Sequence, residues 1–283
     1  MNRESTSPKN EDLSLRDYAI VSNPEYWRGK ESELKSLIDK ASLEIREIEK
    51  SAQREWLPGN AEEAKKIKAI WVLSGAGTYK KTITDDPGDL ANIGKYWIHG
   101  SDRKRIGHAA DLIKKISLIA SGNCLPKEVN SYKISDVEVL ALVKEYGPYL
   151  IYNGTAVQNA DLIAAIKDDS LLMPEEKLFI PESKITKTID QVKMLKFPDI
   201  NFEKNDEIGI VSHAPHLARV MRMVNKYKPI PEGVEVQLYP LVFGDPENER
   251  EFAQSEMKGI VGYVSKGLAT AESSYSYLLA PRA

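Results

Sequence analysis

Residues 206–227 constrain the fold more than any other stretch, because they predict a buried strand that runs directly into an amphipathic helix. Residues 208–211 are a short apolar run, and residues 212–215 form a tight polar turn. Apolar residues then recur at helical spacing and give the helix one apolar face. These residues are Leu217, Val220, Met221 and Val224. A strand followed at once by a helix is typical of sheets that helices cover.

The start of this predicted helix has the features of an anion site. Pro215 suits the first helical position, where its missing N–H costs nothing. Ala214, the expected N-cap, has no side-chain oxygen, so we expect the first helical N–H groups to be available to a ligand. His216 and Arg219 lie one turn apart on the flank of the helix. The alternative is that His213 and His216 are ordinary turn residues and that Arg219 is solvated.

The same alternation of strand, polar turn and helix recurs along the chain. Apolar runs predict strands at 69–73, 149–152, 177–180, 207–211 and 234–238. Strands that alternate with helices indicate a parallel sheet covered on both faces. We therefore expect an α/β fold, namely a Rossmann-like three-layer domain with a mainly parallel five-stranded sheet.

An N-terminal helical cap is expected to precede this domain. Residues 1–12 are polar and predict a disordered tail. Residues 13–60 form the predicted cap, whose strongest helical pattern spans 31–55 and ends at a Pro-Gly pair. Residues 61–283 form the Rossmann-like domain and close with a C-terminal helix. Packing of the cap on this domain is the favoured use, and contact with a partner is the alternative.

Composition describes a soluble globular protein and argues against several classes of partner. The chain has 283 residues, of which 42% are hydrophobic and 29% charged, enough for one substantial core. A net charge of −3 gives no electrostatic footprint for nucleic acid. No apolar run approaches the roughly 20 residues that span a bilayer, and the single Cys124 excludes an internal disulfide. We expect a cytoplasmic protein with neither nucleic-acid nor membrane partners.

Two segments carry side chains that could bind a metal ion, but we expect no tightly bound metal at either segment. The loop at 82–100 carries three aspartates and a histidine, but a solvated Asp-Pro-Gly turn is the favoured interpretation. His213 and His216 have the spacing H-x-x-H, but Pro215 between them should turn the two rings apart. A catalytic zinc generally needs three protein ligands, and the spacing specifies no third one.

The polar turns all follow predicted strands, so we expect them at the carboxyl edge of the sheet, where such folds bind ligands. The residues in the first three turns are Ser74, Gly75, Gly77, Asn153, Gly154, Thr155 and Glu182. Arg105 lies in the first turn of a predicted helix at 102–119, where the helix dipole prefers acids. Function is therefore one explanation for an arginine at that position.

Together these turns resemble the SanA/YdcF-like family, a group of Rossmann-like domains of poorly defined function. That family has a glycine-rich turn after its first strand, an arginine on the next helix and a Ser-Gly-Gly turn after its second strand. A glutamate and polar residues begin the next helix, and a Thr-Ser-x-x-His-x-x-Arg signature follows the fourth strand. The resemblance, over residues 68–240, is carried by Ser74, Gly75, Gly77, Arg105, Asn153, Gly154, Glu182, Thr188, Asp190, Gln191, Ser212, His213, His216 and Arg219.

The chain also departs from this pattern. Ile185 and Lys187 replace a polar residue and an asparagine, Asn153 and Thr155 alter the second turn, and extra residues precede the second strand. The soluble branch of the family is associated with S-adenosylmethionine, so the resemblance implies that cofactor by analogy. A changed ligand is the other outcome that these departures leave open.

We expect a small-molecule-binding protein or enzyme that holds a nucleotide-like or anionic ligand. Arg219 would pair with a carboxylate or phosphate, and His216 would act as a catalytic acid or base. Glu182, the other expected catalytic residue, would accept hydrogen bonds from ribose hydroxyls or a ligand amine. The sequence leaves catalysis, binding alone and the oligomeric state open. The alternative is a non-catalytic regulatory or scaffold protein that binds a protein partner with its helical surfaces.

Overall fold

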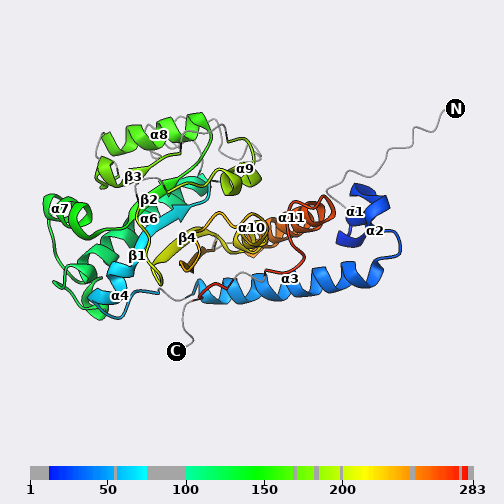
Figure 1. Cartoon of the computed structure of the whole chain (residues 1–283), viewed down its shortest axis with the longest axis horizontal. Helices are drawn as coiled ribbons and strands as arrows, with labels where there is room; N and C mark the ends of the chain where they lie inside the picture. The colour runs from blue at the N-terminus through cyan, green and yellow to red at the C-terminus, as the bar shows by residue number, and fades with distance from the viewer. Residues whose placement is uncertain are drawn as a thin grey trace.

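Five parallel strands form one sheet in the order β3-β2-β1-β4-β5 (Figure 1). The computed structural model describes residues 13–53, 56–74, 100–167, 171–181, 185–197, 200–242, 246–273 and 276–279. The strands are β1 (Ile67–Val72), β2 (Tyr149–Tyr152), β3 (Leu178–Phe179), β4 (Glu207–His213) and β5 (Glu235–Leu241). The predicted Rossmann-like α/β fold with a five-stranded parallel sheet is confirmed.

The strand order creates a switch point between β1 and β4. The chain moves outward from β1 to β2 and β3, then returns to the other side of β1 to form β4 and β5. Connections therefore leave the carboxyl ends of β1 and β4 in opposite directions, which is where open α/β sheets bind ligands.

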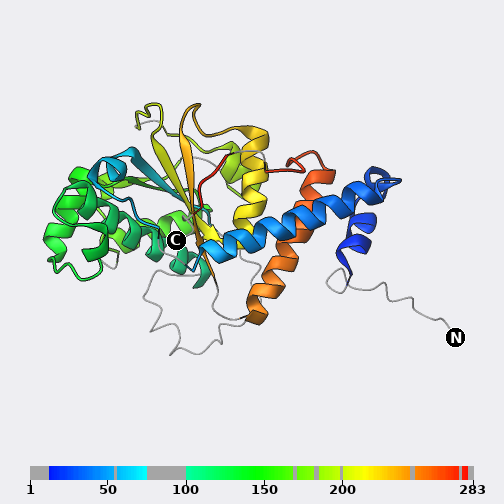
Figure 2. The same cartoon turned by 90° about the horizontal axis from the view of Figure 1, so that it is seen from below.

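Helices cover both faces of the sheet (Figures 1 and 2). One core lies under α4 (Ala61–Lys66), α6 (Gly100–Ala120), α7 (Asp136–Tyr146) and α8 (Ala156–Lys167). The other lies under α3 (Glu31–Ser51), α9 (Thr188–Lys193), α10 (Ala214–Tyr227) and α11 (Pro246–Ser265). The central strand β1 is apolar at successive residues because it is buried on both faces: Trp71 points into one core and Val72 into the other.

The N-terminal helices pack on the second of these faces. Helices α1 (Leu15–Ser22) and α2 (Pro24–Trp27) precede α3, which runs across α10 and α11 (Figure 2). An ion pair joins the partly buried Glu44 of α3 to the buried Arg222 of α10, and the Tyr277 hydroxyl donates to Glu44 over 2.7 Å. The apolar stripe predicted over 31–55 is thus a core-facing stripe on a helix that ends at Ser51.

The C-terminal segment covers the outer edge of β5, which the sequence patterns did not indicate. Leu278 donates its N–H to the Val236 carbonyl (2.7 Å) and accepts from the Leu238 N–H (3.0 Å). The pairing is parallel and leaves less of the β5 edge exposed.

The predicted turn at 212–215 is wrong. Ser212 and His213 continue β4, because β5 extends as far and pairs them with Pro240 and Leu241. Helix α10 therefore begins at Ala214, and His213, instead of Ala214, is its N-cap. The predicted strand at 177–180 is also shorter, with two residues in β3, preceded by a short 3-10 helix (Glu175–Lys177).

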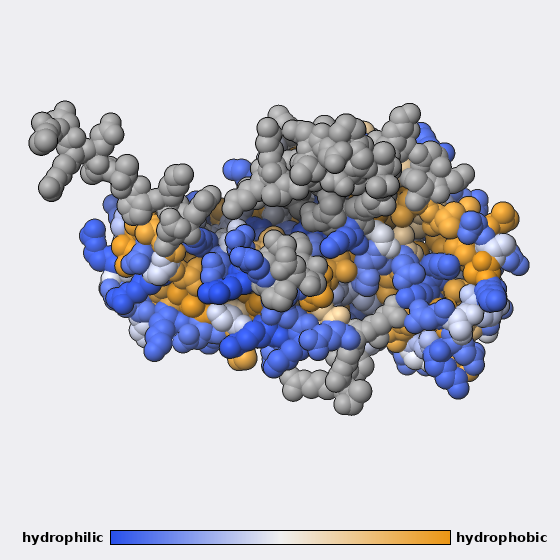
Figure 3. Space-filling model, turned by 180° about the vertical axis from the view of Figure 1, so that it is seen from behind, coloured by the Kyte–Doolittle hydropathy of each residue, from blue (hydrophilic) through white to orange (hydrophobic). Residues whose placement is uncertain are grey.

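The surface in Figure 3 is a mosaic of hydrophilic side chains and separate hydrophobic patches. Within the described ranges, no helix combines the length and the apolar composition that crossing a membrane requires. Four earlier predictions lie outside the described residues: the tail at 1–12, Gly75 and Gly77, most of the loop at 82–100, and Glu182.

Candidate functional site

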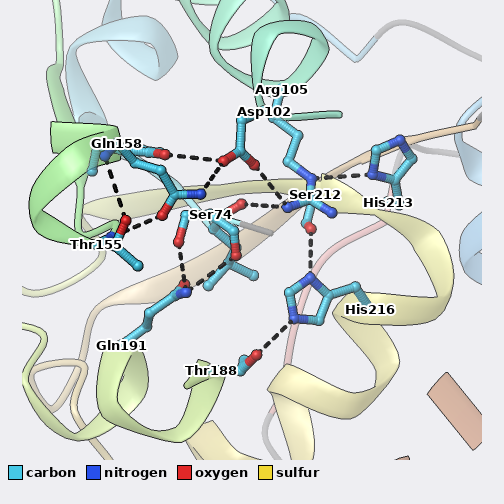
Figure 4. A network of polar contacts seen from close by, with 12 residues as sticks. Ser74, Asp102, Arg105, Thr155, Gln158, Thr188, Gln191, Ser212, His213 and His216 are labelled. Atoms are coloured by element: carbon cyan, nitrogen blue, oxygen red, sulfur yellow. Dashed lines mark hydrogen bonds and ion pairs between the residues drawn. The ribbon is translucent and has the colours of Figure 1, made fainter. Parts of the chain in front are cut away.

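Arg105 joins the ends of β1 and β4 at the switch point (Figure 4). Its Nη1 donates to the carbonyl of Leu73, directly after β1, over 2.9 Å. Its Nε donates to Nδ1 of His213, the last residue of β4, over 3.1 Å. Helical side chains point back toward the helix N-terminus, so Arg105, in the second turn of α6, reaches the sheet edge with only 2% of its surface exposed.

Asp102 holds this guanidinium in place and balances its charge. One carboxylate oxygen lies 3.3 Å from Arg105 Nη1. The other accepts hydrogen bonds from the Tyr152 hydroxyl (3.2 Å) and from Gln158 Nε2 (2.6 Å). Burial lowers the pKa of Arg105 from its ordinary value and the Asp102 charge opposes this shift, so the guanidinium stays protonated. Sequence reasoning missed Asp102, although an acid three residues before an arginine on a helix is a recognisable signal.

His213 is a neutral imidazole in this setting. A guanidinium can only donate, so the His213 Nδ1 that it contacts carries no proton and the ring proton belongs on Nε2. Burial, followed by the charges of Arg105 and Lys104, lowers the pKa of His213 to about 3. The ring also packs edge-on against Phe252 of α11, with centroids 5.7 Å apart.

His216 lies between two hydroxyls, in the first turn of α10. Its Nδ1 is 3.1 Å from Ser212 Oγ, and its Nε2 is 3.5 Å from Thr188 Oγ1. Burial, followed by the charges of Arg219 and Arg105, lowers the pKa of His216 well below its ordinary value. The imidazole is therefore neutral at pH 7, and it can take up a proton only when its surroundings change.

Arg219 faces α11 and pairs with Glu256. Its Nη2 donates to Glu256 Oε1 over 3.1 Å and its Nε donates to Oε2, a bidentate pair. The guanidinium lies 5.4 Å from the ring centroid of Tyr263, and a Cβ on Gly259 would come within 2.9 Å of Arg219 Cδ. One face of α11 thus cradles this side chain, and this contact, which sequence reasoning missed, gives Arg219 a structural role.

Thr188 and Asp190 take different parts at the start of α9. Thr188 is buried and lies 3.5 Å from both His216 Nε2 and Arg219 Nη2, so it faces the site. The Asp190 carboxylate instead accepts from the backbone N–H groups of Thr186 and Lys187, both at 3.0 Å. Asp190 therefore caps the helix and does not join the polar network at the switch point.

Gln191 links α9 to the end of β1. Its Nε2 donates to Ser74 Oγ (2.7 Å) and to the Ser74 carbonyl (3.1 Å). A carbonyl only accepts, so this contact fixes which end of the amide faces Ser74. Gln191 Oε1 is buried and has no hydrogen-bond partner within the described part of the chain. It remains an acceptor beside Ser74, close to the end of β1.

Asn153 and Gly154 have structural reasons for their positions. Asn153 is fully buried, accepts from Trp71 Nε1 (3.0 Å) and donates to the Gln191 carbonyl (2.7 Å). A Cβ on Gly154 would lie 2.7 Å from Tyr152 Cε1 and 2.9 Å from its hydroxyl. A glycine here lets Tyr152 reach Asp102.

The structure thus brings most of the predicted site residues to one edge of the sheet. They are Ser74, Arg105, Asn153, Gly154, Thr188, Ser212, His213, His216 and Arg219. Gly75, Gly77 and Glu182 lie outside the described residues. Within the described ranges, no group of three His, Cys, Asp or Glu side chains is arranged to hold a metal ion.

Comparison with known proteins identifies no relative. No family model, no curated protein and no solved structure matches the chain. The resemblance to the SanA/YdcF-like family therefore stays a prediction that rests on the residues quoted for it.

Proposed function

We propose that this chain binds a small anionic or nucleotide-like ligand at the carboxyl edge of the sheet, between the ends of β1 and β4. The observation that carries the proposal is the position of Arg105, a buried guanidinium that bonds Leu73, directly after β1, and His213, the last residue of β4. Burying a charge is costly, and Asp102 balances this one through a contact of 3.3 Å at a single nitrogen, unlike the bidentate pair that holds Arg219. Arg105 lies at the usual ligand position of this fold, where it can also attract an anionic ligand group.

The first turn of α10 supports the same ligand class. This 14-residue helix begins at the end of β4, has a proline in its first turn, and receives no side-chain cap from the described residues. Its N-terminal N–H groups and dipole favour a negative charge. His213 lies directly before the helix, so the neutral imidazole and the helix end adjoin the same place.

Neutral hydrogen-bonding groups beside the cation favour a ligand larger than an inorganic ion. Ser74, Gln191 and Thr188 supply hydroxyl and amide groups from two further segments. Such groups suit the hydroxyls of a ribose or an amine. S-adenosylmethionine, which the family resemblance implies, has a carboxylate, a ribose and an amine, and it is the first specific ligand that we propose.

Any catalytic role falls to His216 and Glu182 in this proposal. A ligand that brings an anion close to His216 would raise its pKa and allow it to act as a base. Glu182 would bind a ligand hydroxyl or amine. Arg219 is secondary, because Glu256 already pairs with it. Use as a scaffold is less favoured, because α3 of the N-terminal helices packs into the core.

A ligand screen with matched variants tests the proposal. We expect S-adenosylmethionine or an adenine nucleotide, but not chloride at equal ionic strength, to raise the melting temperature of the purified chain. Ser74→Ala and Thr188→Val should weaken that ligand about 2- to 10-fold, the range for one neutral hydrogen bond. Ser131→Ala is the control, because Ser131 is exposed and is not one of the site residues. Absence of any ligand response, with nothing co-purifying by mass spectrometry, would refute the proposal.

A further inference from the structure

A second group of buried polar side chains lies on β4 and β5, nearer the amino ends of the strands. In the parallel register Glu207 faces Glu235, Gly209 faces Gln237, and Val211 faces Tyr239. Side chains alternate between faces along a strand, so all of these residues share one sheet face. Val211 and Tyr239 belong to the core under α4 and α6, which identifies that face.

Tyr239 leans over Gly209 toward Glu207. A Cβ on Gly209 would lie 2.7 Å from Tyr239 Cε2 and 3.1 Å from its Cδ2, so the glycine makes room for the ring. Gly209 lies between Val211 and Glu207 on this face. The ring therefore extends from its own position beside Val211 back toward the carboxylate.

The polar atoms at the ends of the Glu207 and Tyr239 side chains are buried, and neither has a hydrogen-bond partner among the described residues. Glu207 is 8% exposed and Tyr239 is 4% exposed. Glu207 Oε2 and the Tyr239 hydroxyl make no hydrogen bond anywhere in the described ranges. Buried polar groups nearly always have a partner, so two such groups on adjacent strands call for one.

The surroundings of Glu207 are acidic. Burial, then the Glu235 charge, raises the pKa of Glu207 to about 7; Glu63 and Asp206 act in the same direction, and Lys66 opposes them. The other nearby lysine, Lys68, lies 3.5 Å from Asp206. The field at the buried carboxylate therefore favours a positive charge.

A second aromatic side chain lies beside Tyr239. Trp56, half-buried just before α4, packs edge-on against Tyr239 with ring centroids 5.8 Å apart. Aromatic rings beside a carboxylate favour ammonium-type and alkali cations over anions. The available ligand atoms are oxygens, which suit hard cations rather than zinc or copper.

We propose that Glu207 Oε2 and the Tyr239 hydroxyl bind a small monovalent cation, ammonium-type or alkali, in the core under α4. A single buried carboxylate balances one positive charge, and Glu235 across the ladder is exposed to water. The site is independent of the ligand site at the carboxyl edge.

Melting temperatures in different chloride salts test the proposal at constant ionic strength and pH 8, where Glu207 is ionised. The salts are those of sodium, potassium, ammonium and tetramethylammonium; the last, a large cation without N–H donors, is the reference. We expect at least one small cation to raise the melting temperature of the wild-type chain by about 2–4 °C over tetramethylammonium, as binding at about five times its Kd would do. At pH 5.5, where Glu207 is protonated, the difference should vanish.

Three variants distinguish a bound cation from a general salt effect. Glu207→Gln keeps the shape and removes the charge, and Tyr239→Phe removes only the hydroxyl; each should abolish at least half of the cation-specific shift. Glu235→Gln, the exposed acid in the opposite register position, should keep it. Equal melting temperatures in all four salts, or a full shift in Glu207→Gln or Tyr239→Phe, would overturn the proposal.

Discussion

Arg105 Nε donates to His213 Nδ1 over 3.1 Å, and this bond links the charge state of the imidazole to the position of the guanidinium. The ring is held neutral because its Nδ1 lone pair accepts from a group that never loses its proton at ordinary pH. The contact joins α6 to β4, two elements that are far apart in sequence, at the switch point. Its consequences can be measured in the titration of His213 and in the acid stability of the fold.

The first prediction is that acid destabilises the protein through its buried histidines. The pKa of His213 is lowered to about 3 in the folded chain, against an ordinary value near 6.5 in the unfolded chain. Between these values the unfolded chain binds more protons, so the free energy of unfolding falls as pH falls from about 6.5 toward 3, by up to about 1.4 kcal/mol per pH unit for one histidine. Urea unfolding at several pH values measures this slope.

A variant isolates the contribution of His213. His213→Asn removes the titrating group, keeps an acceptor for Arg105 and should reduce the slope. Lys104→Gln removes an exposed neighbouring charge and should change it little, because burial is the largest cause of the shift. An unchanged slope in His213→Asn would mean that other groups, His216 among them, control the acid limb.

The second prediction is that Arg219→Ala destabilises the chain even without ligand. The substitution leaves the Glu256 carboxylate, which is 7% exposed, without its bidentate partner. Removing one partner of a buried pair costs about 3–5 kcal/mol, and the melting temperature should fall by several degrees. Arg250→Ala, an exposed arginine on the same α11, is the control and should change stability by less than about 0.5 kcal/mol.

Ligand binding then separates the two interpretations of Arg219. If the residue is only structural, Arg219→Ala should lower the free energy of ligand binding by no more than it lowers the free energy of unfolding. A normal apo melting temperature together with lost ligand binding would contradict the structural role and return Arg219 to the ligand site.

The sequence predicts the sheet well because continuous apolar runs are a local signal of strands buried on both faces. It also places the polar turns at the carboxyl edge, since all strands of a parallel sheet end there. The partners of the charged residues could not be predicted from the sequence. Glu256 lies on the last helix, and nothing in its local pattern indicates that α11 returns to meet Arg219. The length of β4 was likewise missed, because the register with β5 and not the local sequence extends the strand through His213.

The third prediction concerns Glu207 in tetramethylammonium chloride, where no small cation is present. Its folded pKa of about 7 lies above the ordinary value of 4.5, so between these values the folded chain binds more protons than the unfolded chain. Glu207 therefore contributes a loss of stability of about 1–3 kcal/mol as pH rises from about 4.5 to 7, which opposes the gain from the buried histidines over the same range. Glu207→Gln removes this contribution, so its stability should rise more steeply with pH than that of the wild-type chain, whereas Glu235→Gln should resemble the wild-type chain. Equal slopes in the wild-type chain and Glu207→Gln would contradict a buried carboxyl group with a raised pKa.

The last prediction compares Gly154, in the connection between β2 and α8, with Gly107, which lies within α6. Gly154→Ala places a methyl group 2.7 Å from Tyr152 Cε1 and 2.9 Å from its hydroxyl. Tyr152 is buried and donates to Asp102, so the ring cannot move away without breaking that bond and loosening Arg105. Overpacking of this kind costs about 1–3 kcal/mol, and it should also weaken any ligand at the switch point.

Gly107→Ala is the matched control on α6. A Cβ there meets no atom within 4 Å, and the residue is exposed in the helix. Alanine in place of an exposed helical glycine stabilises by about 0.5–1 kcal/mol, so the two variants should shift the urea midpoint in opposite directions. If Gly154→Ala proved as stable as wild type, Tyr152 would have room to move, and the chain of contacts from Gly154 through Tyr152 and Asp102 to Arg105 would not hold the guanidinium in place.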